Sequence, residues 1–125
     1  MTDNFVAKEY RELTNVEREL IEWLITNSGG YVEKYISQLN QAKVVGRCTC
    51  GCPTIDIALA GKRSRTSGAS TIVAEAEGQS PQGVPLFVIL HAREGELSEL
   101  EVCSLDDVEK FGLPTPEMLA IRKLA

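Results

Sequence analysis

The sequence predicts an α+β fold: two N-terminal helices, then an antiparallel meander of about five strands and a short C-terminal helix. Its 125 residues suit a single domain spanning residues 1–125 and suffice to bury a core. Apolar residues recur at helical spacing before Lys43 and alternate with polar residues after it. No helical segment separates successive strands, which disfavours a parallel, doubly wound sheet.

Two amphipathic helices are expected in the first third of the chain. Thr14 followed by Glu17 fits a capping box, in which each side chain satisfies a free backbone amide of the first turn. The first helix should end at 28–30, where a serine precedes two glycines. A second helix is expected within 31–42. Its apolar stripe consists of Val32, Tyr35, Ile36 and Leu39.

The remaining elements follow from alternation and from turn residues. Strands are expected at 43–50, 54–60, 71–78, 84–92 and 97–104. A Gly-Cys-Pro turn at 51–53 joins the first two strands, and Gly95 marks a hairpin turn before the last. After Pro114 and Pro116, the segment from Glu117 to Leu124 predicts the short helix.

Composition and charge restrict the function. No apolar run approaches the roughly 18 residues that a membrane span needs, and the N-terminus lacks the pattern of a signal peptide. We therefore expect a cytoplasmic protein whose thiols stay reduced. With a net charge of −5, nucleic-acid binding is not expected either. The one basic cluster, at 61–65, is interpreted as a solvated loop.

Three of the four cysteines lie in the segment Arg47–Thr54, as C-x-C-G-C-P. Alternate residues of a strand share a face, so Cys48 and Cys50 should lie on the same side as Val44. This favours the interpretation that both are small buried residues of the core, with Cys52 in the turn. A thioredoxin-like redox site is not favoured, because the chain has no C-x-x-C motif.

Zinc binding is the alternative interpretation of the same segment. Thiolates of Cys48, Cys50 and Cys52 would serve as ligands in a tetrahedral site, with Cys103 as a candidate fourth. The spacing differs from the usual paired motifs. In addition, strand alternation places Cys103 on the face of Glu99 and Glu101.

Catalytic groups are scarce in this sequence, and we expect a protein that is not an enzyme. His91 is the single histidine. A Cys103–His91 pair would form only if the last two strands bring both side chains together in register. Without such a pair, no side chain has an evident partner for nucleophilic catalysis.

Acidic residues on outward strand faces and in the last hairpin are the predicted binding residues. An acidic surface complements a basic protein partner and speeds the encounter with it. Small acidic α+β proteins recur among bacterial immunity proteins, which neutralise toxins with basic clefts, so a basic toxin domain is one candidate partner. The predicted binding residues are Glu75, Glu77, Glu94, Glu96, Glu99 and Glu101.

Two motifs also carry a family resemblance. The first is the L-T-x-x-E start of a helix at Leu13–Glu17, and the second is the V-V-x-x-C-x-C-G-C-P-T hairpin at Val44–Thr54. In these features the chain resembles a family of small, uncharacterised bacterial proteins, over most of the segment from Tyr10 to Val102. The resemblance implies no activity, and Cys103 is not part of its pattern.

Overall fold

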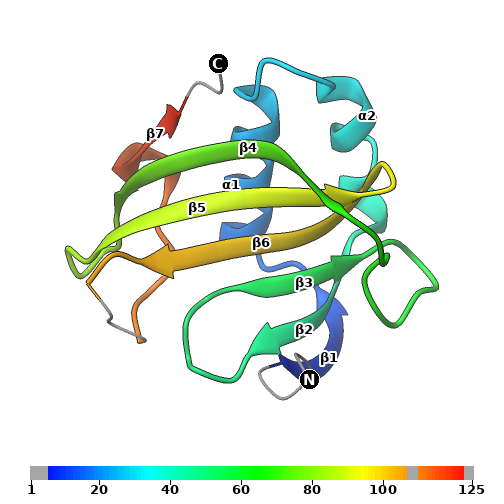
Figure 1. Ribbon diagram of the computed structural model, residues 1–125, viewed down its shortest axis with the longest axis horizontal. Coiled ribbons are helices and arrows are strands. Elements are labelled where there is room, and N and C mark those ends of the chain that lie inside the picture. Colours follow the sequence, from blue (N-terminus) through cyan, green and yellow to red (C-terminus); the bar gives the residue numbers. More distant parts are fainter. Residues whose placement is uncertain (1–5, 107–109, 123–125) are drawn as a thin grey trace.

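The computed structural model describes residues 6–106 and 110–122 (Figure 1). Its central feature is one antiparallel sheet of seven strands in the order β1-β2-β3-β6-β5-β4-β7. The strands are β1 Val6–Glu12, β2 Lys43–Cys48, β3 Ile55–Ala58, β4 Ser70–Gln79, β5 Pro85–Arg93, β6 Glu96–Ser104 and β7 Leu119–Arg122.

Helices α1 (Asn15–Thr26) and α2 (Val32–Ile36) follow β1, and two short 3₁₀ turns, η2 (Leu39–Gln41) and η3 (Pro116–Met118), precede β2 and β7. The predicted capping box at the start of α1 is confirmed. The Thr14 amide donates to Glu17 Oε1 at 2.8 Å, and the Glu17 amide donates to Thr14 Oγ1 at 3.1 Å. Within the described ranges, no helix is both long and apolar enough to cross a membrane.

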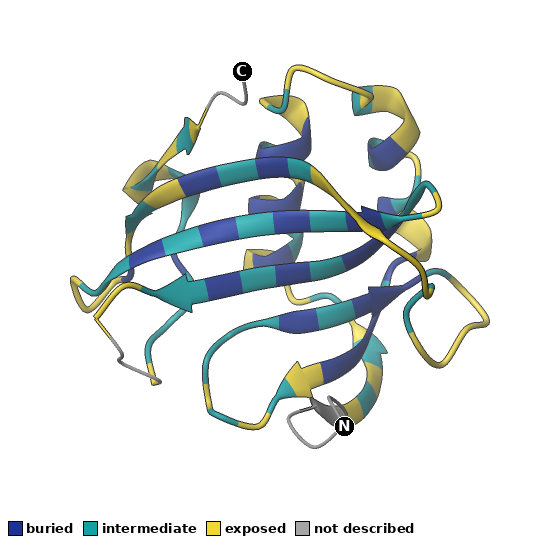
Figure 2. Cartoon of the chain, in the orientation of Figure 1, coloured by how far each residue is buried: buried dark blue, intermediate teal, exposed yellow. Residues whose placement is uncertain are grey.

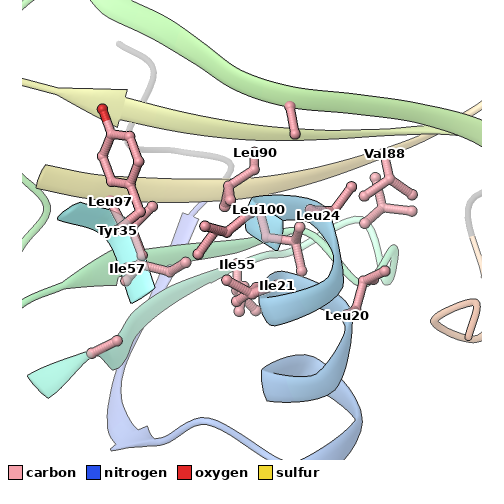
Figure 3. Packing of buried hydrophobic residues seen from close by; sticks show 14 of the residues in the cluster. Leu20, Ile21, Leu24, Tyr35, Ile55, Ile57, Val88, Leu90, Leu97 and Leu100 are labelled. Atoms are coloured by element: carbon pink, nitrogen blue, oxygen red, sulfur yellow. The ribbon is translucent and has the colours of Figure 1, made fainter. Parts of the chain in front are cut away.

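Helix α1 covers one face of the sheet, behind the strands in the view of Figure 1. The apolar residues on its inward side are fully buried, and they meet the inward side chains of β3, β5 and β6 (Figure 3). On β5, buried and half-buried residues alternate, with Leu86, Val88 and Leu90 inward (Figure 2). Burying a side chain of this size stabilises the fold by about 1.5–3 kcal/mol relative to leaving it exposed.

The predicted arrangement of two helices, a five-stranded meander and a terminal helix is wrong. Strand β1 precedes the first helix and pairs with β2. The second helix is a single short turn, α2, separated from η2. The predicted C-terminal helix is η3 followed by β7, which pairs with β4, while residues 123–124 of the predicted helix lie outside the described residues.

The strand order also departs from a meander. Strands β4, β5 and β6 follow one another, but β3 pairs with β6 instead of β4. The segment between β3 and β4 therefore carries the chain past two strands, to the far side of β5. As a result, β6 lies in the middle of the sheet, directly beside β3 and the turn that contains the cysteines (Figure 1).

Candidate metal centre

A bulge in β2 decides which face the cysteines occupy. Val44 pairs with Ile57, and both are buried in the core, whereas Gly46 pairs with Asp56 after a register shift. Cross-strand partners share a face, and Asp56 is a half-buried residue of the face that α1 does not cover. The prediction that Cys48 points into the core with Val44 is therefore wrong, because the bulge reverses the alternation.

The turn after β2 draws three sulfur atoms together. The Cys48 amide donates to the Thr54 carbonyl at 3.2 Å and closes the turn, in which Gly51 has a φ of +100°. The Cys52 amide donates to Cys50 Sγ at 3.3 Å, and the sulfurs of Cys48 and Cys50 are 2.9 Å apart. All three sulfurs lie within 4.8 Å of one another. Cys50 is half-buried and contacts the other two cysteines, so its predicted place in the core is wrong as well.

This cluster fits the requirements of a zinc ion. With Zn–S bonds of about 2.3 Å, tetrahedral geometry separates ligand sulfurs by roughly 3.8 Å. The sulfurs of Cys48, Cys50 and Cys52 lie close to that separation, since all are within 4.8 Å of one another. All three are free and half-buried, so no disulfide competes for them. The donor set suits a thiophilic metal, because soft thiolates favour zinc over magnesium or calcium.

Cys103 lies on the wall of the same hollow. This hollow has a volume of about 590 Å³, and its lining includes all four cysteines of the chain together with Glu99, Glu101 and Phe111. Thr54 ties the cysteine turn to β6, since its hydroxyl donates to the Val102 carbonyl at 3.2 Å and accepts from the Val102 amide at 2.9 Å. Cys103 directly follows Val102, the residue that these two hydrogen bonds hold.

A chain of hydrogen bonds fixes the side chain of Cys103. Its thiol donates to Glu101 Oε2 at 3.1 Å, and Glu101 Oε1 lies 2.8 Å from His91 Nε2. The other ring nitrogen of His91 is 2.6 Å from Ser70 Oγ. Burial, and then the hydrogen bond to Glu101, raise the pKa of Cys103 to about 12. The hydrogen bond from His91 lowers the pKa of Glu101, against the effect of burial.

The Cys103–His91 pair considered from the sequence does not form. His91 pairs with Glu99 across the two strands, and Cys103 pairs with Phe87. Glu101 lies between the two side chains and is hydrogen-bonded to both. The thiol and the imidazole are thus linked through a carboxylate instead of touching.

Four of the six predicted binding glutamates already have a charged or titratable partner within the chain. The contacts are Glu75–Arg122, Glu96–Lys62 and Glu101–His91 at 2.8 Å, and Glu99–Arg65 at 3.2 Å. Glu77 and Glu94 are exposed, and neither has an ion pair within the described part of the chain.

The basic segment 61–65 folds back onto the acidic residues of β3 and β6. Arg65 bridges Asp56 and Glu99, which the sequence interpretation of a solvated loop did not anticipate. Burial raises the pKa of Glu99, while the charges of His91 and Arg65 oppose the rise. The acidic face is therefore partly neutralised by cations of the same chain.

A second hollow, of about 410 Å³, lies beside the same turn, and Cys52 belongs to its lining too. Its two cations are Arg11 and Arg47, and both pair with acidic residues of β1 and α1. These ion pairs leave neither arginine without a partner for its charge. The cysteine side of the turn consequently offers the more distinctive chemistry.

Sequence reasoning missed the role of Thr54 and the approach of Cys103 to the other cysteines. A signal for Thr54 was present, since a hydroxyl residue directly after a Gly-Cys-Pro turn can bond to a neighbouring backbone. The approach of Cys103 had no local signal, because it depends on the pairing of β3 with β6.

Compared with protein-family models, with curated proteins and with solved structures, the chain has no match. The resemblance to a bacterial family therefore stays a prediction, and the geometry of the site is the evidence on function.

Proposed function

We propose that this protein binds one zinc ion through the thiolates of Cys48, Cys50 and Cys52. The observation that carries the proposal is the convergence of these three sulfur atoms to within 4.8 Å of one another. Thiolates are ligands of both structural and catalytic zinc, and a half-buried turn at the end of a hairpin is accessible to the ion. Reduced thiols are needed for this chemistry, which agrees with the proposed cytoplasmic location.

Bound zinc would act mainly on the stability of the hairpin. The turn from Cys48 to Thr54 has few backbone hydrogen bonds of its own, and its cysteines bond mainly to each other. Because the unfolded chain holds no preformed site, the free energy of metal binding becomes free energy of folding. We propose a role in metal binding without catalysis.

The hypothesis of an acidic surface that binds a protein stays a prediction, including the case of a toxin domain. The ion pairs of the structure reduce the number of glutamates available to an external partner, since Glu75, Glu96, Glu99 and Glu101 have partners within the chain. Charges left for an external partner would come first from Glu77 and Glu94.

The test is a zinc competition titration of the full chain under reducing conditions, with a chromophoric chelator. We expect one zinc ion per chain to be withdrawn from the chelator. Cys50→Ser removes the sulfur that contacts both other cysteines, and its affinity should fall by at least about 100-fold, since even residues behind the ligands change metal affinity by 10–100-fold.

Thr49→Ala is the matched control, because Thr49 lies between two of the cysteines and its side chain is exposed. This variant should keep the affinity of the unchanged protein. Circular dichroism without metal checks that each variant keeps the sheet. Equal zinc affinities of Cys50→Ser and the unchanged protein would contradict the proposal, as would a failure of the unchanged protein to compete.

A further inference from the structure

We infer that Cys103 supplies the fourth ligand of this zinc ion and closes the coordination shell as a four-thiolate site. The inference rests on the proposed function and extends it to a residue of a different strand. It is carried by the gathering of all four cysteines of the chain around one hollow, although Cys103 lies far from the other three in the sequence.

The topology explains how Cys103 reaches the cluster. Asp56 of β3 pairs with Glu99 of β6, and both lie on the face away from α1. Alternation along β6 then places Glu101 and Cys103 on that same face. The bulge in β2 turns Cys48 to this face too, so two independent features of the sheet place Cys48 and Cys103 on one face.

Hydrogen bonds hold the two parts of the site in register. Cys52 Sγ lies 3.4 Å from Thr54 Oγ1, and the same hydroxyl is bonded twice to the backbone of Val102. Since Cys103 follows Val102 directly, the Thr54 hydroxyl connects Cys52 to the backbone next to Cys103. A metal site with ligands from separate parts of the chain needs such a connection, because the coordinating side chains must be held near their binding positions.

Glu101 orients the Cys103 thiol before the metal binds. Its carboxylate holds the Cys103 thiol at 3.1 Å and is itself held by His91. When the S–Zn bond forms, the S–H bond of Cys103 breaks and its proton passes to solvent. The hydrogen bond from the thiol to Glu101 is then lost, and the carboxylate keeps its hydrogen bond to His91.

A cationic side chain lies close to the turn and would offset part of the negative charge of four thiolates around one zinc ion. A Cβ at Gly51 would meet Cγ of Lys110 at 3.1 Å and its Cε at 3.5 Å, so the lysine side chain runs along the turn. Lys110 thus lies beside Gly51, which belongs to the turn that carries the cysteines. Zinc in such a shell has no open position, which is typical of structural sites.

X-ray absorption of the zinc-loaded full chain tests this without any substitution. Four sulfur neighbours at about 2.3 Å would support the inference, whereas three sulfurs and one oxygen or nitrogen at about 2.0–2.1 Å would overturn it. If the unchanged chain binds no zinc, the proposed function fails together with the inference. If it binds zinc with three sulfurs, the inference alone fails.

Cobalt substitution gives a second, independent readout. Cys103→Ala should bind Co²⁺ at least 10-fold more weakly, and its thiolate charge-transfer absorption should fall by about a quarter, because one of four thiolates is lost. Thr49→Ala should keep both the affinity and the spectrum. A Cys103→Ala spectrum and affinity equal to those of the unchanged protein would overturn the inference.

Discussion

Glu17 is the one charged residue that is buried in the described ranges, with 7% of its surface exposed. Arg11 holds its carboxylate with two hydrogen bonds, of 2.9 and 3.0 Å, and the Thr14 amide donates a third. Burial by itself would raise the pKa of Glu17, but these hydrogen bonds outweigh it and lower the pKa. The carboxylate therefore joins β1 to the start of α1 as an ionised group.

Replacing this carboxylate should destabilise the fold in a pH-dependent way. We expect Glu17→Gln to lower the free energy of unfolding by about 1–2 kcal/mol at pH 7, the usual effect of losing a charged hydrogen bond and a helix cap. A lowered pKa means that the contribution is present above the unfolded pKa and is lost as the pH falls through the folded one. Urea unfolding at pH 7 and pH 3 measures it.

Glu22→Gln is the control for that experiment, because Glu22 lies on the same helix and is exposed. Its unfolding free energy should stay close to that of the unchanged protein at both pH values. A gap between Glu17→Gln and the unchanged protein that persists undiminished at pH 3 would contradict the ionised role of Glu17.

Single residues also show which parts of the site are readable from sequence. Thr14 and Glu17 were predictable as a pair because their contact is local, three residues apart on one helix. The face of Cys48 was not, because one register shift in β2 reverses every later side chain of that strand. The cysteine motif is recognisable by its spacing alone, but the bulge in β2 determines the face of the sheet on which Cys48 lies.

At the scale of elements, the backbone of the β5–β6 turn is strained. Its two turn residues, Glu94 and Gly95, both have positive φ values, of 51° and 80°. This is the pattern of a type I′ turn, whose twist matches that of the flanking strands and which favours Asn-Gly. A glutamate in the left-handed region is disfavoured, since its Cβ crowds the backbone.

Glu94→Asn should relieve part of this strain. Asparagine tolerates the left-handed conformation, so we expect the free energy of unfolding to rise by up to about 1 kcal/mol. The midpoint of urea unfolding measures the change. Glu77→Asn puts the same substitution into the extended backbone of β4 and should bring no gain. A midpoint of Glu94→Asn at or below that of the unchanged protein would count against the account of the turn.

Strand β7 shows where a prediction from local sequence patterns fails. The segment after Pro116 is rich in good helix formers, yet 119–122 pairs with β4 as strand β7. Gly78 of β4 allows this, because a Cβ there would collide with the carbonyl oxygen of Met118. A glycine inside a predicted strand can mark a close approach of another backbone, and Gly78 was the sequence feature that could have indicated the pairing with β7.

At the scale of the whole molecule, the position of β6 determines the candidate site. Neighbouring strands in sequence usually pair, and on that basis β6 belongs at an edge, away from the cysteine turn. The structure places β6 beside β3, and this brings Glu101 and Cys103 to the hollow that the turn lines. Such non-local pairing leaves no mark on any short stretch of sequence.

The measurement that tests the central claim most directly is native mass spectrometry of the full chain, purified under reducing conditions without added metal. We predict a dominant species that carries one zinc ion and loses it, together with part of its stability, when a strong chelator is added. Elemental analysis should agree, at close to one zinc per chain. A zinc content below about 0.2 per chain, with no uptake when zinc is supplied, would contradict a metal centre built on these cysteines.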